Sequence, residues 1–399
     1  MLRKIVVLLM VYLLYGQSLM ANAAVENIIL TYQDDPRHSQ SITWQTKTKD
    51  VANFLYVTTD KTKKWAKYQA TIQEFVTTDE LIYLHTVKLN DLKSDQQYFY
   101  EISNSHEKLE EGTFKTAGEK NPKFLIFGDS QSVNYSTWQQ TLTNAVKFNP
   151  TVDFFVNVGD LVDVGQDYKQ WQKFLAASKI ISKNLSFVPV VGNHETYVGD
   201  GTFAMPTYFT TQLKVPTNGP PELKGQVYSF DYGQIHFVVL DSQFGEERAF
   251  VPNSLELQKQ WLIRDLANNK KPYIIVFMHR NPYHSGNSSK LEATAGFIPI
   301  FDLYKVNLVF CGHEHVVAKT YPLIADKNDE NGTSYFTCGR SGTKIYNNKE
   351  QKSYHEYFYN ITAQPTYFTV ELNDNAFVVK AYTQDGNLLQ DSIIKVKAD

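Results

Sequence analysis

Five apolar, strand-like runs of this 399-residue chain end in residues that could bind a metal ion. Those residues are Asp129, Asp160, Asn193 followed by His194, His279, and His313 with His315. Carboxylate, amide and imidazole groups suit divalent ions such as Mn, Fe, Zn or Co, whereas Cu(I) prefers thiolates. One Asp or His after a strand is common, but five such placements together predict a metal site.

The elements that must position these residues alternate in type. Apolar runs such as 123–129, 153–160 and 273–279 alternate with amphipathic helices predicted over residues 136–148, 168–181, 254–266 and 296–304. The runs are apolar on both faces, as strands covered on both sides must be. This alternation predicts an α/β domain with right-handed crossovers. Ligands of open α/β sheets bind beyond the carboxyl ends of the strands, so we expect the five polar ends to converge.

The segments on either side of this domain carry strand signals. Residues 25–118 consist of short strand-like runs separated by turn residues, which predicts a β-sandwich. Leu92 and Tyr98 have the spacing of a tyrosine corner, and Trp44 is predicted to lie in the core of the facing sheet. Residues 117–122 are polar and turn-rich, like a linker. From about residue 333 the strand signals return, and we expect these strands to complete a second sheet of the α/β domain.

The first 23 residues have the pattern of a cleaved signal peptide. Arg3 and Lys4 precede an apolar stretch over residues 5–15, and Ala21-Asn22-Ala23 offers a cleavage site. This pattern predicts a secreted or periplasmic protein with no stable membrane insertion after cleavage. Cys311 and Cys338 are the two cysteines, and the sequence leaves a disulfide and two buried thiols equally open.

The composition excludes some classes of protein and of partner. A hydrophobic share of 42% with 20% charged residues is that of a folded globular protein rather than a disordered one. The 39 Lys and Arg are balanced by 42 Asp and Glu, without a dense basic tract, so double-stranded nucleic acid is not an expected partner. The charge balance indicates no other partner and no oligomeric state.

Five sequence blocks resemble, in order and spacing, those of the calcineurin-like metallophosphoesterases. The blocks are Gly128-Asp129, Gly159-Asp160, Gly192-Asn193-His194-Glu195, Val276-Phe277-Met278-His279 and Gly312-His313-Glu314-His315. A fibronectin-III-like sandwich before such a domain is similar to the purple acid phosphatase arrangement. The resemblance implies a sandwich domain over residues 25–118 and, over 122–399, a four-layer αββα domain with two mixed sheets.

The resemblance also implies a site with two divalent metal ions, Fe, Mn or Zn. Asp129, Asp160 and His315 would hold the first ion, and Asp160, Asn193, His279 and His313 the second. Asp160 would bridge two ions about 3.5–4 Å apart. His194 would be a catalytic imidazole that binds no metal. The implied reaction is hydrolysis of small phosphate monoesters by in-line attack of a metal-bridging hydroxide.

Three positions depart from the family pattern or have no clear match in it. Asp163 stands where purple acid phosphatases carry the iron-binding Tyr, so we expect a colourless protein, with Asp163 itself a candidate catalytic group. Gln131 stands where many relatives have His, and its amide oxygen is a candidate ligand of the first ion. His284 is the one nearby candidate for the paired catalytic histidines of plant purple acid phosphatases.

Two other functions stay open at the level of sequence. A phosphodiesterase or nucleotidase could use the same metal scaffold, because pocket-shaping loops such as residues 196–226 decide the substrate. The protein could also be a non-catalytic surface-binding protein in which the sandwich binds the partner. The intact set of ligand-type residues favours an enzyme.

Overall fold

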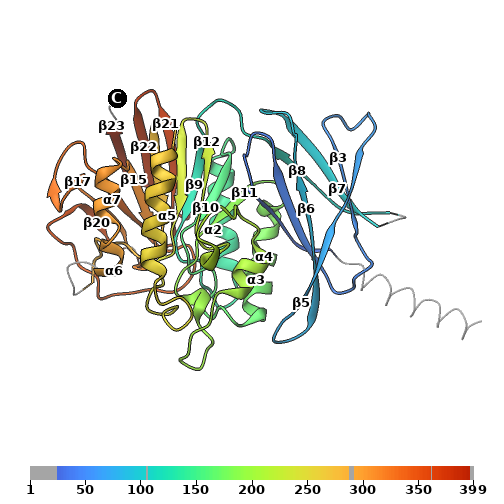
Figure 1. Ribbon diagram of the computed structural model, residues 1–399, viewed down its shortest axis with the longest axis horizontal. Coiled ribbons are helices and arrows are strands. Elements are labelled where there is room, and N and C mark those ends of the chain that lie inside the picture. Colours follow the sequence, from blue (N-terminus) through green and yellow to red (C-terminus); the bar gives the residue numbers. More distant parts are fainter. Residues whose placement is uncertain (1–24, 105–106, 287–291, 361, 396–399) are drawn as a thin grey trace, which may run out of the picture.

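The computed structural model describes residues 25–104, 107–286, 292–360 and 362–395 (Figure 1). The predicted signal peptide, residues 1–23, lies outside the described residues. The predicted fold class is confirmed, because a strand-rich N-terminal part precedes an α/β part with two mixed sheets. Within the described ranges, no helix combines the length and the apolar character needed to cross a membrane.

The N-terminal part is a sandwich of eight strands. They are β1 (Glu26–Thr31), β2 (Gln40–Thr46), β3 (Phe54–Thr58), β4 (Ala66–Gln69), β5 (Thr71–Val76), β6 (Leu81–Leu89), β7 (Gln97–Ser103) and β8 (Lys108–Lys115). Sheet β4-β3-β7-β8 faces strands β1, β2, β6 and β5 across a core that contains Trp44 and Tyr100. The tyrosine corner is confirmed, because the backbone N–H of Lys93 donates to the Tyr98 hydroxyl at 2.8 Å.

One sheet of the sandwich continues into the α/β part. The ten-stranded sheet has the order β23-β22-β21-β9-β10-β11-β1-β2-β6-β5, with β9 (Lys123–Phe127), β10 (Phe154–Asn157) and β11 (Ser186–Pro189) parallel to one another. Strand β1 pairs with β11 in parallel at Thr31 and Phe187. The predicted domain division at residues 118–122 falls between β8 and β9, yet hydrogen-bonded strands connect both sides of it. The sequence pattern did not predict this continuity.

The second sheet has seven strands in the order β12-β13-β14-β15-β19-β16-β20. Their bounds are Tyr228–Tyr232 (β12), Ile235–Val239 (β13), Tyr273–Phe277 (β14), Leu308–Cys311 (β15), Val317–Thr320 (β16), Ser334–Cys338 (β19) and His355–Tyr359 (β20). A two-stranded ribbon, β17 (Leu323–Ile324) with β18 (Lys327–Asn328), lies outside it. Both cysteines are buried free thiols on the neighbouring strands β15 and β19, which corresponds to the second of the two alternatives that the sequence leaves open.

The last three strands correct one expectation. Strands β21 (Thr366–Asn373), β22 (Ala376–Thr383) and β23 (Leu388–Lys395) were expected to complete the second sheet with β19 and β20, but they extend the first. Strand β21 pairs antiparallel with β9, where Phe368 lies opposite Ile126. An apolar strand pattern predicts burial but does not specify the neighbouring strand, so the pairing was not readable from the sequence.

Helices cover the outer faces of the two sheets and complete four layers. On the first sheet lie α2 (Ser136–Phe148), α3 (Tyr168–Ser182) and α4 (Thr207–Gln212); on the second lie α5 (Ser254–Asn268), α6 (Glu292–Ala295) and α7 (Ile298–Leu303). Side chains of β9 alternate between the layers: Phe124 lies in the core between the sheets, and Leu125 faces the helices. This alternation explains why the run is apolar on both faces.

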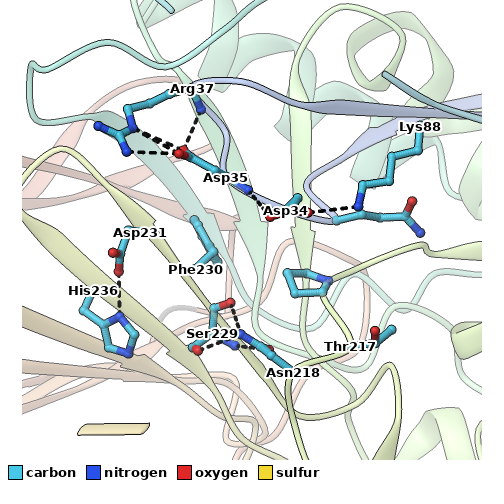
Figure 2. A pocket seen from close by; sticks show the side chains of 12 residues that line it. Asp34, Asp35, Arg37, Lys88, Thr217, Asn218, Ser229, Phe230, Asp231 and His236 are labelled. Carbon is cyan, nitrogen blue, oxygen red and sulfur yellow. Dashed lines mark hydrogen bonds and ion pairs between the residues drawn. The ribbon is translucent and has the colours of Figure 1, made fainter. Parts of the chain in front are cut away.

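A polar cleft of about 530 Å³ lies where the sandwich meets the α/β part (Figure 2). Asp34, Asp35, Arg37 and Lys88 line it from the sandwich, and residues 216–218 and 229–231 with His236 line it from the other side. Its charged groups are paired with one another: Arg37 with Asp35 at 3.0 Å, Lys88 with Asp34 at 3.0 Å, and His236 with Asp231 at 2.7 Å.

Candidate metal centre

The five predicted polar ends lie beyond the carboxyl ends of β9, β10, β11, β14 and β15. The loops there approach each other closely. A Cβ atom on Gly192 would lie 2.3 Å from the backbone nitrogen of Asp160, and one on Gly312 would lie 2.6 Å from a carboxylate oxygen of Asp129. Glycine is therefore required at position 192, and a side chain at position 312 would displace the carboxylate of Asp129. The backbone of Asp160 and His313 has positive φ, 56° and 70°, a strained conformation that is common at functional sites.

One set of converging side chains comprises Asp160, His279, His313 and Asn193. These are the residues expected to hold the second ion, and we call them the second-ion group. One candidate ligand atom from each of Asp160, His279 and His313 lies within 4.8 Å of the others. Nε2 of His279 lies 3.2 Å from Oδ2 of Asp160 and 3.1 Å from Oδ1 of Asn193. The Nδ1–H of His279 donates to the carbonyl of Val158 at 2.8 Å. This bond fixes the tautomer that presents Nε2 to a metal ion.

The other set comprises Asp129, His315 and Gln131, and we call it the first-ion group. Nε2 of His315 lies 3.2 Å from Oδ1 of Asp129, while its Nδ1–H donates to the carbonyl of Lys344 at 2.8 Å. Nε2 of His315 and both amide atoms of Gln131 are buried without a hydrogen-bond partner among the described residues. Buried polar atoms are rarely left unpaired, and a metal ion would satisfy Nε2 of His315 and the amide oxygen of Gln131. The residues present therefore fit divalent metal ions.

The charges of the second-ion group stabilise one another. Burial raises the pKa of Asp160, but the positive charge of His279 and the hydrogen bond from it outweigh burial and hold this pKa well below its usual range. Burial lowers the pKa of His279, but the charge of Asp160 and their hydrogen bond outweigh it and raise this pKa to about 9. Burial, together with the charge of His279, lowers the pKa of His313 far below its usual value. The group thus combines an ionised carboxylate with a neutral imidazole, both suitable as ligands.

Glu195 connects two of the loops that carry these ligands. Its buried carboxylate accepts four backbone N–H bonds: from Asp160 at 2.9 Å and Gly192 at 2.7 Å on Oε2, and from Leu161 at 2.8 Å and Val162 at 3.2 Å on Oε1. Burial and the charge of Asp160 raise the pKa of Glu195 to about 8, whereas the four N–H groups favour its ionised form. These bonds fix the loop of Asp160 against the loop of Asn193.

His194 lies beside the second-ion group and is held from two sides. Its Nδ1–H donates to the carbonyl of Asp163 at 2.6 Å, and its ring packs against Tyr197 with centroids 4.4 Å apart. Nε2 lies 3.9 Å from Oδ2 of Asp160 and 3.0 Å from Nζ of Lys344. Asp163 contacts His194 through its backbone carbonyl and through its half-exposed carboxylate, whose Oδ1 lies 3.4 Å from Nδ1 of His194 and 3.0 Å from Nζ of Lys344. The structure thus brings Asp163 beside His194.

His284 lies next to the block that carries His313 and His315. Its Nδ1 is 3.7 Å from Oε1 of Glu314, which also accepts a bond from Nζ of Lys349 at 2.9 Å. Burial raises the pKa of Glu314, but the bond from His284 and the charge of Lys349 outweigh burial and lower this pKa to about 2. His284 contacts Glu314, Gly286 and Tyr354.

Sequence reasoning missed three residues at the centre. Lys344 contacts His194, the ring of Tyr346 lies over His315 with centroids 4.3 Å apart, and the hydroxyl of Tyr197 accepts a bond from Nδ2 of Asn193 at 2.7 Å. Tyr197 follows Asn193 by four residues, a spacing that could have indicated it. Lys344 and Tyr346 follow β19 in a loop without ligand-type spacing, so no sequence signal marked them.

Two family profiles match the chain. The calcineurin-like phosphoesterase profile matches residues 122–317, which include every residue of both ion groups. The purple acid phosphatase N-terminal domain profile matches residues 25–116, the sandwich.

Individual relatives match about 60% of the chain. An uncharacterized protein of Mycobacterium tuberculosis is 28% identical over 267 residues, 59% of this chain and 50% of that protein. Purple acid phosphatase 21 of Arabidopsis thaliana is 27% identical over 274 residues, 65% of this chain and 59% of that protein. Some relatives are named as probable inactive purple acid phosphatases. The chain spans about half the length of the curated relatives it matches.

A solved structure shares the fold. A purple acid phosphatase from yellow lupin seeds superposes with a TM-score of 0.79 at 18% identity, covering 94% of this chain and 75% of that chain. At this identity the likeness concerns the fold.

Proposed function

Since the chain is a calcineurin-like metallophosphoesterase with a purple acid phosphatase N-terminal domain, we propose that it hydrolyses small phosphate monoesters at a centre of two divalent metal ions. The observation that carries the proposal is the grouping of Asp160, His279 and His313 within 4.8 Å. Beside it, buried Nε2 of His315 and the amide oxygen of Gln131 have no hydrogen-bond partner among the described residues. Such a donor set suits Fe, Mn or Zn.

Each ion would have its own set of ligands, with one carboxylate shared. Asp129 and His315, with Gln131 as a further candidate, would hold the first ion; Asn193, His279 and His313 would hold the second, with Asp160 between the two. When bound, two such ions polarise a phosphoryl group and lower the pKa of a water molecule from 15.7 to about 7. The backbone bonds to Glu195 keep the loops of Asp160 and Asn193 in place.

His194 is the proposed catalytic imidazole. Its Nδ1–H is committed to the carbonyl of Asp163, so Nε2 is the atom that can exchange a proton with a substrate or donate to it. Nε2 lies 3.9 Å from the carboxylate of Asp160, beside the place where a substrate phosphate would bind. There it would stabilise the negative charge that develops on the phosphoryl oxygens or protonate the leaving oxygen.

The test is a comparison of two esters. Protein stripped with a chelator and reconstituted with Mn, Zn or Fe should hydrolyse p-nitrophenyl phosphate faster than bis-p-nitrophenyl phosphate. Faster turnover of the diester would favour the phosphodiesterase alternative. Turnover of neither ester with any of the metals would refute the proposal and favour a non-catalytic binding protein. Some relatives are named as probable inactive purple acid phosphatases.

Two variants separate metal binding from catalysis. His194→Ala should lower turnover severely while the metal content stays near that of the wild type, because His194 is no proposed ligand. Asp160→Asn should lose metal, measured by elemental analysis. Asp374→Asn, in an exposed turn between β21 and β22, is the matched control and should keep both. Two retained ions in Asp160→Asn would contradict the bridging role.

We also propose that the protein is exported to the periplasm or the cell exterior. The support is the charged, then apolar, then small-residue pattern of residues 1–23. N-terminal sequencing of the protein recovered from the producing cells should begin after Ala23 or close to it. An intact Met1 would contradict export by cleavage.

A further inference from the structure

We propose that Lys344 binds the substrate phosphate and gives the site its preference for phosphate monoesters over diesters. This inference rests on the proposed function, because it assigns a substrate contact at the same site. Lys344 follows β19 and lies outside residues 122–317, which match the phosphoesterase profile.

The backbone around Lys344 is fixed to the first-ion group. The N–H groups of Ser341 and Gly342 donate to the carbonyls of Gly128 at 2.7 Å and Asp129 at 3.0 Å. The N–H of Thr343 donates to the carbonyl of Gln131 at 3.0 Å. The carbonyl of Lys344 itself accepts the Nδ1–H of His315 at 2.8 Å. Residues 341–344 therefore hold a constant position relative to the proposed ligands.

The side chain of Lys344 extends from this loop to the proposed catalytic imidazole. Nζ lies 3.0 Å from Nε2 of His194 and 3.0 Å from Oδ1 of Asp163. Because the Nδ1–H of His194 donates to the carbonyl of Asp163, Nε2 is the acceptor and the ammonium group is the donor. The ammonium therefore occupies the side of His194 from which a substrate would be contacted. The side chain is 32% exposed, so an anion from solvent can reach it.

The ion pair with Asp163 alone does not explain this position. The carboxylate of Asp163 is 51% exposed, and ion pairs with exposed carboxylates contribute little to stability. A phosphate group carries more charge than Asp163 and has several acceptor oxygens, so it competes well for the ammonium group. We expect Nζ to move from Asp163 to a phosphoryl oxygen when substrate binds.

The charge of the substrate explains the expected preference. A phosphate monoester has a second pKa of about 6 and carries nearly two negative charges at neutral pH. A diester carries one charge and has one fewer terminal oxygen. An additional cation beside the metal ions and His194 therefore favours the monoester, because the monoester has one more terminal oxygen and more negative charge with which to bind that cation.

The experiment uses the metal-reconstituted full chain with Lys344→Gln and Lys344→Arg. For Lys344→Gln we expect kcat/KM for p-nitrophenyl phosphate to fall roughly 10- to 50-fold, as for one lost charge-assisted hydrogen bond, with bis-p-nitrophenyl phosphate changed less than about threefold. Lys344→Arg keeps the charge and should retain most of the monoester activity. Lys270→Gln, at an exposed position after α5, is the matched control and should behave as the wild type.

A binding measurement makes the result independent of turnover. Calorimetric titration with inorganic phosphate should show binding weakened by a similar factor in Lys344→Gln, with unchanged metal content. Equal losses for both esters, unchanged phosphate binding, or loss of metal in Lys344→Gln would each overturn the inference. If the wild type hydrolyses neither ester, the proposed function fails, but the phosphate titration still decides whether Lys344 binds phosphate. A wild type that hydrolyses neither ester and binds no phosphate overturns both the proposed function and the inference about Lys344.

Discussion

His236 is the group through which we expect pH to act on stability away from the metal centre. It lies on β13, where Nδ1 is 2.7 Å from Asp231 and Nε2 is 2.8 Å from Asp265 of α5 (Figure 2 shows the pair with Asp231). Burial lowers the pKa of His236, but the hydrogen bonds to the two carboxylates outweigh it and raise this pKa to about 9. The charged imidazole therefore links α5 to the second sheet.

The magnitude follows from the difference between folded and unfolded pKa values. The unfolded imidazole titrates near 6.5, so stabilisation is complete below about pH 6.5 and is lost as the pH rises through about 9. This shift corresponds to about 3 kcal/mol, at roughly 1.4 kcal/mol per pKa unit. Because the carboxylate of Asp231 is 48% exposed, solvent screens its interaction with the imidazole. We therefore expect the charged imidazole to stabilise the fold by about 2 kcal/mol.

The assay is urea unfolding of the wild type and His236→Gln without metal at several pH values. We expect the variant to be less stable by about 2 kcal/mol near pH 6 and the difference to disappear near pH 9.5. Asp265→Asn should remove part of the same difference, and the exposed Asp374→Asn should remove none. A difference between wild type and His236→Gln that does not change with pH would refute the reasoning, because a merely structural role of the ring is independent of its charge.

Three further changes test other parts of the structure. Glu195→Gln places an amide NH2 group against two of the four backbone N–H donors, so we expect a loss of about 2–4 kcal/mol in unfolding free energy together with reduced metal content; full metal retention would contradict the role of Glu195 in holding the loops. Tyr98→Phe removes the acceptor for the N–H of Lys93 and should cost about 1 kcal/mol in urea unfolding, whereas an unchanged midpoint would show that the corner contributes nothing. Iron-loaded protein should lack a tyrosinate absorption band in visible spectra because Asp163 replaces the Tyr of purple acid phosphatases; a visible band would show that another tyrosine, such as Tyr346 or Tyr197, binds the iron.

The local elements of the site could be predicted from the sequence. Each proposed ligand lies within four residues of the end of a strand whose apolar pattern is local, and the chemistry of Asp, Asn and His is a property of the residue. The helices began and ended within a few residues of the predicted bounds for α2, α3 and α5. The tyrosine corner was likewise readable, because Leu92 and Tyr98 are close in the chain.

Contacts between distant segments were decided by the tertiary structure alone. An apolar pattern states that a strand is buried, but not which strand lies beside it, so the pairing of β1 with β11 and of β21 with β9 was unpredictable. The same holds for Lys344, which reaches His194 across 150 positions of sequence and has no spacing that marks it. The sequence by itself thus determined the proposed ligands and the chemistry they suit. The tertiary structure decided which ammonium group and which aromatic rings lie beside the proposed ligands, because those contacts depend on how the two sheets pack.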